Sequence, residues 1–478
     1  MTFPAPLVDA IRWLSSPFPA LRQRNFRYFW FGQIVSLVGT WMQNIGLAWL
    51  VIKLTNSPFL LGLVSAMQFL PVMLFSLFAG PFVDRFPKRK MLLFTQSALM
   101  VLALVMVIIT GLGIVQYWMI IVLSVLLGFI NTLDIPTRQS FVIELAGREH
   151  LVNAISLNSA AFNTARMVGP AVAGILIGLV GIAPCFLLNA LSFVAVLWAL
   201  MCISLPHRVR QPVEGHRLFQ GVLASVGEGL AYVRARPALL LPLLQIGLLS
   251  TIVINYSVFV PVFARRQLKG DAIHFGLLMT SMGIGSLVAA LRLAVRSRRG
   301  PQLRSLTLGA VGMSAFFLLT GFQTDFLLSG VCLGLTGFFT ITFTASANAW
   351  VQLQSGDSMR GRVMSIYALV FGGVTPIGSL YAGWIIDAVG ISPAIIVSGV
   401  LGLLSTLGIV VVALFWSRHR VEHPLRGQEP DDHQDDADQV AAQNVDGGDT
   451  GLTPAEKLER FHAEGTERRE PSEEPGLK

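Results

Sequence analysis

The sequence predicts an all-α polytopic membrane protein with twelve transmembrane helices in two pseudo-symmetric six-helix bundles. Three observations lead to this class. The 478 residues are 53% hydrophobic and only 13% charged, whereas a soluble globular chain has about 25% charged residues. Twelve apolar runs are long enough to cross a bilayer, and two sets of six share a register of Gly and Pro. A soluble fold of this length has too little polar surface to cover such a composition, so a soluble enzyme, a nucleic-acid-binding protein and a secreted scaffold are excluded.

The spans follow from bilayer thickness, because a hydrocarbon core about 30 Å thick needs roughly 20 apolar residues per helix. The first six are predicted at 26–52, 58–83, 90–112, 116–136, 151–180 and 182–204. The second six are predicted at 238–264, 273–295, 303–322, 325–352, 361–387 and 391–416. The expected domains are an N-terminal segment 1–25, an N-terminal bundle 26–204, a linker 205–237, a C-terminal bundle 238–416 and a tail 417–478.

Charged residues predict the orientation. Residues 1–420 carry a net +18 and residues 421–478 a net −10. If both termini are cytoplasmic, the cytoplasmic loops hold 24 Lys and Arg and the outer loops only 4. Positive residues concentrate on the cytoplasmic side of membrane proteins, so an even number of spans with both termini inside is expected. The acidic tail is too polar to form a core and is predicted to be disordered and solvated.

The linker has its own periodicity. Apolar residues recur at helical spacing from Phe219 to Val233, flanked by Arg217, Glu228 and Arg234. This pattern predicts an amphipathic helix that lies on the cytoplasmic leaflet, serves as a simple connection between the bundles, or does both.

An internal repeat relates the two halves. At an offset of 209 residues, Gly169, Gly174 and Gly181 match Gly378, Gly383 and Gly390, and at an offset of 214 Gly62 matches Gly276. Two six-helix units related by an axis along the membrane normal enclose a central cavity, and rocking of one against the other opens that cavity to each side in turn.

The loop after the second span carries a recognisable motif. It reads Gly80-Pro-Phe-Val-Asp84-Arg85-Phe-Pro-Lys88-Arg89-Lys90. This resembles the G-x-x-x-D-R-x-G-R-R signature of the major facilitator superfamily, with Pro87 where that signature usually has Gly. The resemblance covers about residues 20–418 and implies the fold of that superfamily.

The resemblance also implies roles for the charges. Asp84 would lie near the N-terminus of span eleven, around Arg362, and act as a conformational latch with Gly80, Arg85, Lys88 and Arg89. A carboxylate is favourable at a helix N-terminus. Asp134, near the inner end of span four, would form a charge relay in which Arg89 or Lys88 pairs with it, and Arg138 belongs to the same coupling group.

The fifth span holds a second motif. Arg166, Gly169, Pro170 and Gly174 are similar to the G-P-x-x-G-G motif of superfamily antiporters, with Ala173 at the first Gly of the closing pair. Either this segment is part of a proton-exchange switch, or its small residues simply pack closely against span eight. Arg166 is one of few ionisable residues in a span, and such residues are costly. It either pairs with a carboxylate or attracts a polar or anionic substrate group.

A polar stripe suggests a substrate site. Gln33, Thr40 and Asn44 follow helical spacing in span one, and Gln68, Asn163 and Asn255 extend the set from other spans. Interhelical hydrogen bonding is the alternative role.

Finer resemblance points to bacterial exporters. The segments 24–33 and 131–139, with Gly39-Thr-Trp41, look like the enterobactin-exporter and macrolide-efflux-like group. This resemblance implies a non-enzymatic, proton-coupled antiporter that exports small amphipathic molecules (drugs, siderophores or secondary metabolites) across the bacterial inner membrane, as a monomer embedded in lipid, without nucleic acid. Importer function and a non-transporting receptor or assembly role remain alternatives. No P-loop occurs, and no cofactor or metal is expected.

Overall fold

The computed structural model describes residues 18–147, 149–203, 218–296, 303–356 and 358–422. The chain divides into two units, residues 1–416 and 417–478, and the membrane crossings belong to the first. Predictions about residues 1–17, most of the linker before Leu218, and the acidic tail from residue 423 lie outside the described residues.

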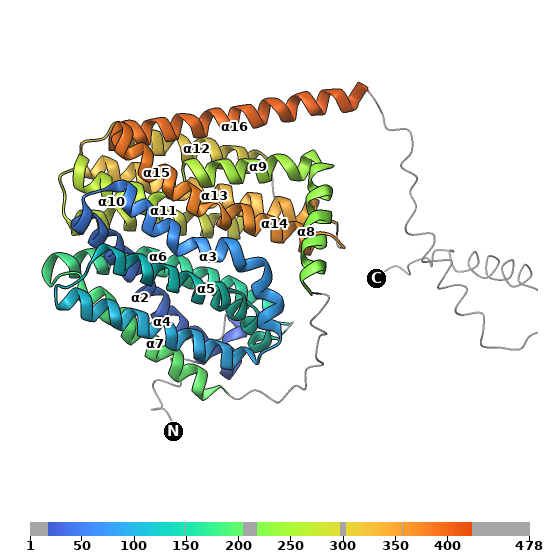
Figure 1. The fold of residues 1–478 in the computed structure, drawn as a ribbon. Coiled ribbons are helices and arrows are strands. Elements are labelled where there is room, and N and C mark those ends of the chain that lie inside the picture. The colour runs from blue at the N-terminus through green and yellow to red at the C-terminus, as the bar shows by residue number, and fades with distance from the viewer. Residues whose placement is uncertain (1–17, 148, 204–217, 297–302, 357, 423–478) are drawn as a thin grey trace, which may run out of the picture. The chain divides into compact units, whose positions relative to one another are not determined.

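Six crossings form the N-terminal bundle (Figure 1). Its elements are η1 (Pro19–Arg22), α2 (Arg24–Thr55), α3 (Pro58–Asp84), α4 (Lys88–Gly111), α5 (Tyr117–Ala146), α6 (Leu151–Leu179) and α7 (Ala183–Cys202). Helix α2 packs along α6 and α7, and α5 packs along α3 and α4. The start of α3 has a local cause: Ser57 accepts a hydrogen bond from the Leu60 N–H, and Pro58 occupies the first turn, where no N–H is needed.

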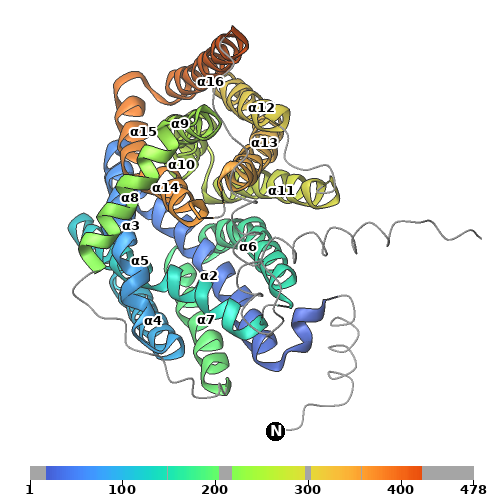
Figure 2. The same cartoon turned by 90° about the vertical axis from the view of Figure 1, so that its right-hand side faces the viewer.

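The second six crossings form the C-terminal bundle (Figure 2). Its elements are α9 (Pro237–Ile252), α10 (Tyr256–Val262), the π-helical turn η3 (Phe263–Gln267), α11 (Ala272–Arg296), α12 (Leu303–Gly321), α13 (Phe326–Gln354), α14 (Arg360–Gly373), α15 (Thr375–Val389) and α16 (Ile391–Glu422). Helix α13 packs along α11 and α12. The described residues thus contain the twelve predicted spans, and their outward faces expose large apolar side chains such as Phe94 and Trp384, as lipid contact requires.

Two crossings are interrupted, which the sequence pattern did not predict. The seventh crossing breaks between Ile252 and Tyr256, where the Asn255 side chain donates to the carbonyls of Ser250 and Thr251 at 3.1 and 2.8 Å. The amide therefore replaces the backbone donors that the break removes. The eleventh crossing breaks at Val374, just before Thr375 and Pro376, because proline lacks an N–H and disfavours a helical residue before it.

The helices share two common ends. We call the end of the bundle at which α2 begins (Arg24) the proximal end, and the end at which α2 finishes (Thr55) the distal end. The turns at Asn56, Gly113, Gly181, Lys269 and Gly390 are distal, and all five have positive φ. Gly181 and Gly390 are partners in the predicted repeat and follow equivalent helices with this left-handed geometry, which a side chain would strain.

The two bundles meet through α3 with α15 and α6 with α11. A Cβ at Gly174 would approach the Ala272 carbonyl oxygen at 2.9 Å and the Gly276 Cα at 3.0 Å. A Cβ at Gly383, the repeat partner of Gly174, would approach the Pro58 carbonyl oxygen at 2.7 Å and the Phe59 Cα at 2.8 Å. Repeat-related glycines therefore permit the same close approach at the two seams between the bundles.

The predicted linker helix is present as α8 (Leu218–Arg234). It packs against α14 and also contacts α3 and α9, so it touches helices of both bundles. At the other end of the second half, α16 continues to Glu422 instead of ending at residue 416.

Candidate functional site

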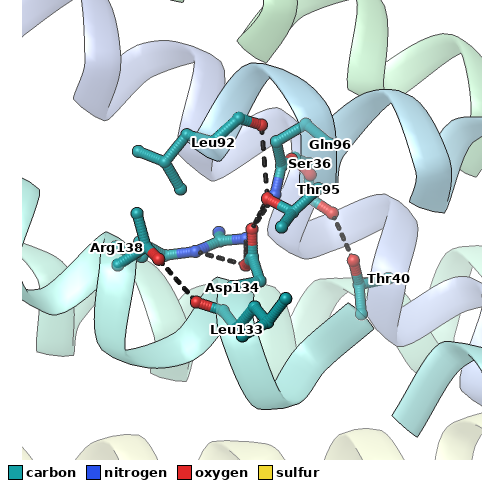
Figure 3. Close-up of polar contacts among 9 residues, drawn as sticks. Ser36, Thr40, Leu92, Thr95, Gln96, Leu133, Asp134 and Arg138 are labelled. Carbon is teal, nitrogen blue, oxygen red and sulfur yellow. Dashed lines mark hydrogen bonds and ion pairs between the residues drawn. The ribbon is translucent and has the colours of Figure 1, made fainter. Parts of the chain in front are cut away.

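Asp134 is the centre of a buried polar cluster in the N-terminal bundle (Figure 3). Its carboxylate is 2% exposed and accepts hydrogen bonds from Thr95 Oγ1 and Gln96 Nε2, each at 2.7 Å. Arg138, one turn further along α5, forms an ion pair with it and adds an Nε–H bond at 3.1 Å. Burial of a charge is tolerated when it is paired and hydrogen-bonded in this way.

The structure thus brings Asp134 and Arg138 together, but Arg89 binds the end of α7. Its guanidinium donates from Nε to the Leu200 carbonyl at 2.7 Å and from Nη2 to the Met201 carbonyl at 2.9 Å. These carbonyls end α7 and have no partners within the helix, so Arg89 caps that terminus. The expected Arg89–Asp134 pair is therefore absent, because Arg138 lies within the same helix at the ideal spacing and Arg89 satisfies α7.

The loop 2–3 motif lies at the proximal end between α3 and α4. Lys88 is 4% exposed, whereas Arg85 is exposed. No described atom lies within 4 Å of a Cβ placed at Gly80. Asp84 ends α3, but its side chain lies outside the described part of the structure. The latch therefore stays a prediction.

Arg166 lies at the seam between the bundles. A Cβ at Gly283 of α11 would approach the Arg166 carbonyl at 3.0 Å. The guanidinium carbon lies 5.8 Å from the centre of the Trp41 ring, and Tyr256 of α10 is close enough to interact with it electrostatically. Arg166 is half-buried.

The two glycines of the span-five motif pack against two different helices. A Cβ at Gly169 would approach the Val38 carbonyl of α2 at 3.1 Å, whereas Gly174 faces α11. The Pro170 carbonyl, in turn, lies 2.5 Å from a Cβ placed at Gly276. The geometry therefore provides the close packing against span eight that was one of the two interpretations of this motif.

The polar residues of span one do not act as one group. Gln33 is 5% exposed and its Oε1 has no hydrogen-bond partner among the described residues. Thr40 is half-buried and donates to the Ser36 carbonyl at 2.9 Å, while Asn44 is half-buried. Gln43 accepts from Asn189 Nδ2 of α7 at 2.7 Å, which is an interhelical bond of the structural kind.

The remaining residues of the predicted substrate site do not form one group either. Asn163 is 9% exposed, donates to the Ser159 carbonyl at 2.8 Å, and has an Oδ1 without a partner among the described residues. Asn255 supports the break in the seventh crossing, and Gln68 is half-buried on α3. Of this set, Asn163 lies one turn from Arg166 on the same helix.

Sequence reasoning missed a set of bonds that closes the distal end. Asp387, near the end of α15, accepts from the Phe59 N–H at 3.0 Å and from Ser57 Oγ at 3.3 Å. Arg266 of η3 donates to the Asn56 carbonyl at 2.6 Å. A carboxylate at the start of α3 is favoured by the helix dipole. The available signal was a single Asp at the end of a span, which does not identify its partner.

The distal end also holds a local cap. Asp271 accepts from the N–H groups of Ile273 and His274 at 3.0 and 3.1 Å and thereby caps α11. The hydrogen bond from the His274 side chain, at 2.7 Å, is the main cause that lowers the pKa of Asp271 below its usual value. The cap therefore stays ionised at neutral pH.

At the proximal end, the linker helix is tied to the start of α14. Glu228 and Arg362 form an ion pair at 2.7 Å, and the Gly356 N–H donates to the Tyr232 hydroxyl at 3.2 Å. The Arg236 guanidinium stacks over the Tyr232 ring at 3.7 Å. Arg362, expected near Asp84, is thus bonded to the linker, and only the fold brings these distant segments together.

The arrangement has the form of a two-bundle carrier. It has a seam of small residues between the bundles, a buried ion pair of Asp134 with Arg138 in one bundle, and the Arg166 guanidinium at the seam. Residues 15–433 match the family model described as "Transmembrane secretion effector". The chain belongs to the transmembrane secretion effector family, within the major facilitator superfamily. The protein is therefore a multi-pass membrane transporter and not an enzyme.

Individual relatives agree with the family. The chain is 26% identical to the staphyloferrin A transporter of Staphylococcus aureus, over 82% of this chain and 96% of that protein. It is also 26% identical to the multidrug efflux pump Tap of Mycolicibacterium fortuitum, over 80% of this chain and 94% of that protein. The solved nucleoside transporter NupG has the same fold, with a TM-score of 0.66 and 10% identity over 81% of this chain and 98% of NupG.

Proposed function

We propose that this transporter exports small amphipathic molecules from the bacterial cytoplasm across the inner membrane, in exchange for protons and by alternating access. The distal closure carries the proposal. Small residues and three hydrogen bonds join the bundles at that end, beside a half-buried Arg166 at mid-depth. Such a state loads substrate from the proximal side. The resemblance to a siderophore transporter and a drug pump supports small-molecule export.

The orientation follows from charge. Most of the Lys and Arg residues in the loops between the spans lie in loops at the proximal end. We therefore assign the proximal end to the cytoplasm. Both termini are then cytoplasmic, and the bundles at 26–204 and 238–416 act as the two moving halves of a monomer.

Proton exchange needs a carboxylate that changes protonation during the cycle. Asp134 is the described carboxylate buried within a span, and its ion pair with Arg138 supplies a two-state contact. Protonation of Asp134 would release Arg138, and deprotonation would restore the pair. We assign coupling to these two residues on that basis.

Export is tested by the accumulation of a panel of fluorescent dyes, some cationic, some neutral and some carrying a carboxylate, in a bacterial strain that lacks its own drug pumps. Cells that express the transporter should accumulate less of at least one dye than cells with an empty vector, and an uncoupler should remove the difference. Higher accumulation in expressing cells would indicate import. If a panel of dyes and antibiotics shows no difference at all, transport of this class of compound is contradicted.

The latch makes a separate prediction. Asp84→Asn removes the negative charge at the proximal end of α3 without changing the shape of the side chain, so the protein should reach the membrane in normal amounts. Export should fall by about 5- to 30-fold, because a charge at a helix terminus contributes roughly 1–2 kcal/mol where the geometry is favourable. Efflux of a dye that the wild type exports, normalised to the amount of protein in the membrane, checks this result. Near-normal efflux would contradict the latch.

A further inference from the structure

We propose that Arg166 is the anion-binding residue of the transport site, so that the substrate class is small amphipathic molecules that carry a carboxylate. The inference rests on the proposed function and specifies its substrate. It starts from the position of Arg166 at mid-depth, where α6 meets α11 and where the neighbours Trp41 and Tyr256 come from different bundles. A transporter of this fold binds its substrate at such a place.

The charge of Arg166 is not balanced by a carboxylate in the described part of the protein. Of the described acidic side chains, Asp134 is the one buried within a span, and it is bonded to Thr95, Gln96 and Arg138. Asp271 and Asp387 lie at the distal end and are engaged in helix caps. A guanidinium surrounded by protein and without a counter-charge is costly, so an arriving anion gains more there than at a solvated site.

The neighbours of Arg166 provide the rest of the site. Trp41 offers a ring face 5.8 Å from the guanidinium carbon and makes an edge contact with Phe162, so it can pack an apolar or aromatic portion of the substrate. Asn163, on the preceding turn, is only 9% exposed, and its unpartnered Oδ1 can accept a hydrogen bond. The Tyr256 hydroxyl is already bonded to Thr340 Oγ1 at 2.9 Å, so it is engaged within the C-terminal bundle.

These features together select an amphipathic acid. The guanidinium binds the carboxylate with charge-assisted hydrogen bonds, the Trp41 face packs the apolar part, and Asn163 accepts from a hydroxyl or amide of the substrate. A neutral analogue of the same shape leaves the guanidinium uncompensated and should bind less tightly by about tenfold or more.

The test uses the purified full-length transporter in lipid nanodiscs with 1-naphthylacetate and 1-naphthylacetamide, which share a ring system and differ in charge. Wild type should bind the carboxylate at least about tenfold more tightly, and Arg166→Gln should lose this preference. Arg166→Lys should keep part of it, because the charge remains. The matched control is Arg292→Gln, since Arg292 is an exposed arginine at the proximal end of α11 that stacks on Phe338. It should bind both compounds as wild type does.

Two further measurements separate the possible outcomes. Sodium phosphate and sodium chloride should not displace naphthylacetate at equal concentration; displacement would show a simple-anion site and overturn the proposal. Equal binding of acid and amide by wild type, or a full preference in a folded Arg166→Gln variant, would overturn it as well. If the wild-type protein exports no compound of the dye and antibiotic panel, the proposed function is contradicted instead. The failure of the binding proposal and the failure of the proposed function are therefore distinguishable.

Discussion

Replacement of Asp134 by alanine is expected to destabilise the transporter by about 3 kcal/mol and to abolish export. The carboxylate accepts from Thr95, Gln96 and Arg138 at a site that is 2% exposed, so its removal leaves three donors without their acceptor. The Arg138 side chain is 24% exposed and can partly rehydrate, which places the cost at the lower end of the range for a broken buried pair. Thermal unfolding of the purified protein measures the loss.

A double-mutant cycle identifies the ion pair as the cause. Asp134→Ala combined with Arg138→Ala should be more stable than Asp134→Ala alone, because the uncompensated guanidinium is also removed. If the two changes are simply additive, the pair contributes no coupling free energy. Neither the single nor the double variant should export in response to a proton gradient.

Proton coupling is separated from stability by Asp134→Asn. The amide keeps an acceptor oxygen for Thr95 or Gln96 and has nearly the shape of the carboxylate, so this variant should be more stable than Asp134→Ala although it also loses the ion pair with Arg138. It cannot gain or lose a proton in the cycle, and efflux should no longer respond to an uncoupler. Wild-type uncoupler sensitivity in a folded Asp134→Asn variant would assign coupling to another group.

Replacement of Gly62 by alanine is expected to open the distal end. A Cβ at this position would overlap the Ser379 carbonyl oxygen and lie 3.3 Å from the Gly383 Cα, and both are backbone atoms that cannot rotate away. Overpacking of this kind costs about 1–3 kcal/mol, which corresponds to a roughly 5- to 150-fold shift away from the distally closed state.

The shift can be measured with a cysteine reporter. Ala272→Cys places a thiol at the distal seam, where the native residue is 2% exposed, in a background without the three native cysteines. Gly62→Ala should increase its labelling by a membrane-impermeant maleimide by about tenfold. Gly408→Ala is the matched control, because a Cβ there meets no described atom within 4 Å and the residue lies on an exposed face of α16. Equal labelling of the two variants would contradict a distal seam that depends on Gly62.

Much of the architecture was predictable from local patterns. The length of each apolar run predicts a span, because a helix in lipid must form all of its backbone hydrogen bonds within itself and present apolar side chains to the lipid. Neither requirement depends on a distant part of the chain. The repeat of Gly174 in Gly383 and of Gly62 in Gly276 was also visible, and these residues line the seams between the bundles. The breaks at Asn255 and Val374 were not predicted, since an amide that replaces backbone donors looks like any other buried polar residue in a sequence.

The polar contacts were less predictable. Asp134 and Arg138 share a helix at a spacing of four, so their pairing follows from α-helical geometry. Arg89 with α7, Glu228 with Arg362, and Asp387 with the start of α3 each join segments more than a hundred residues apart. A charge in a sequence has many possible partners within reach, and only packing selects among them.

The sequence by itself determined that this chain is a twelve-span membrane protein with duplicated halves and few ionisable residues in its spans. Those properties depend on hydrophobic length, helical period and residue spacing, which are local quantities. The tertiary structure alone decided that hydrogen bonds join the bundles at the distal end, which charges far apart in the chain are paired, and that Arg166 lies near Trp41 and Tyr256 of other helices. These properties depend on the packing of helices far apart in the chain, where a separation of one or two ångströms determines whether a contact forms.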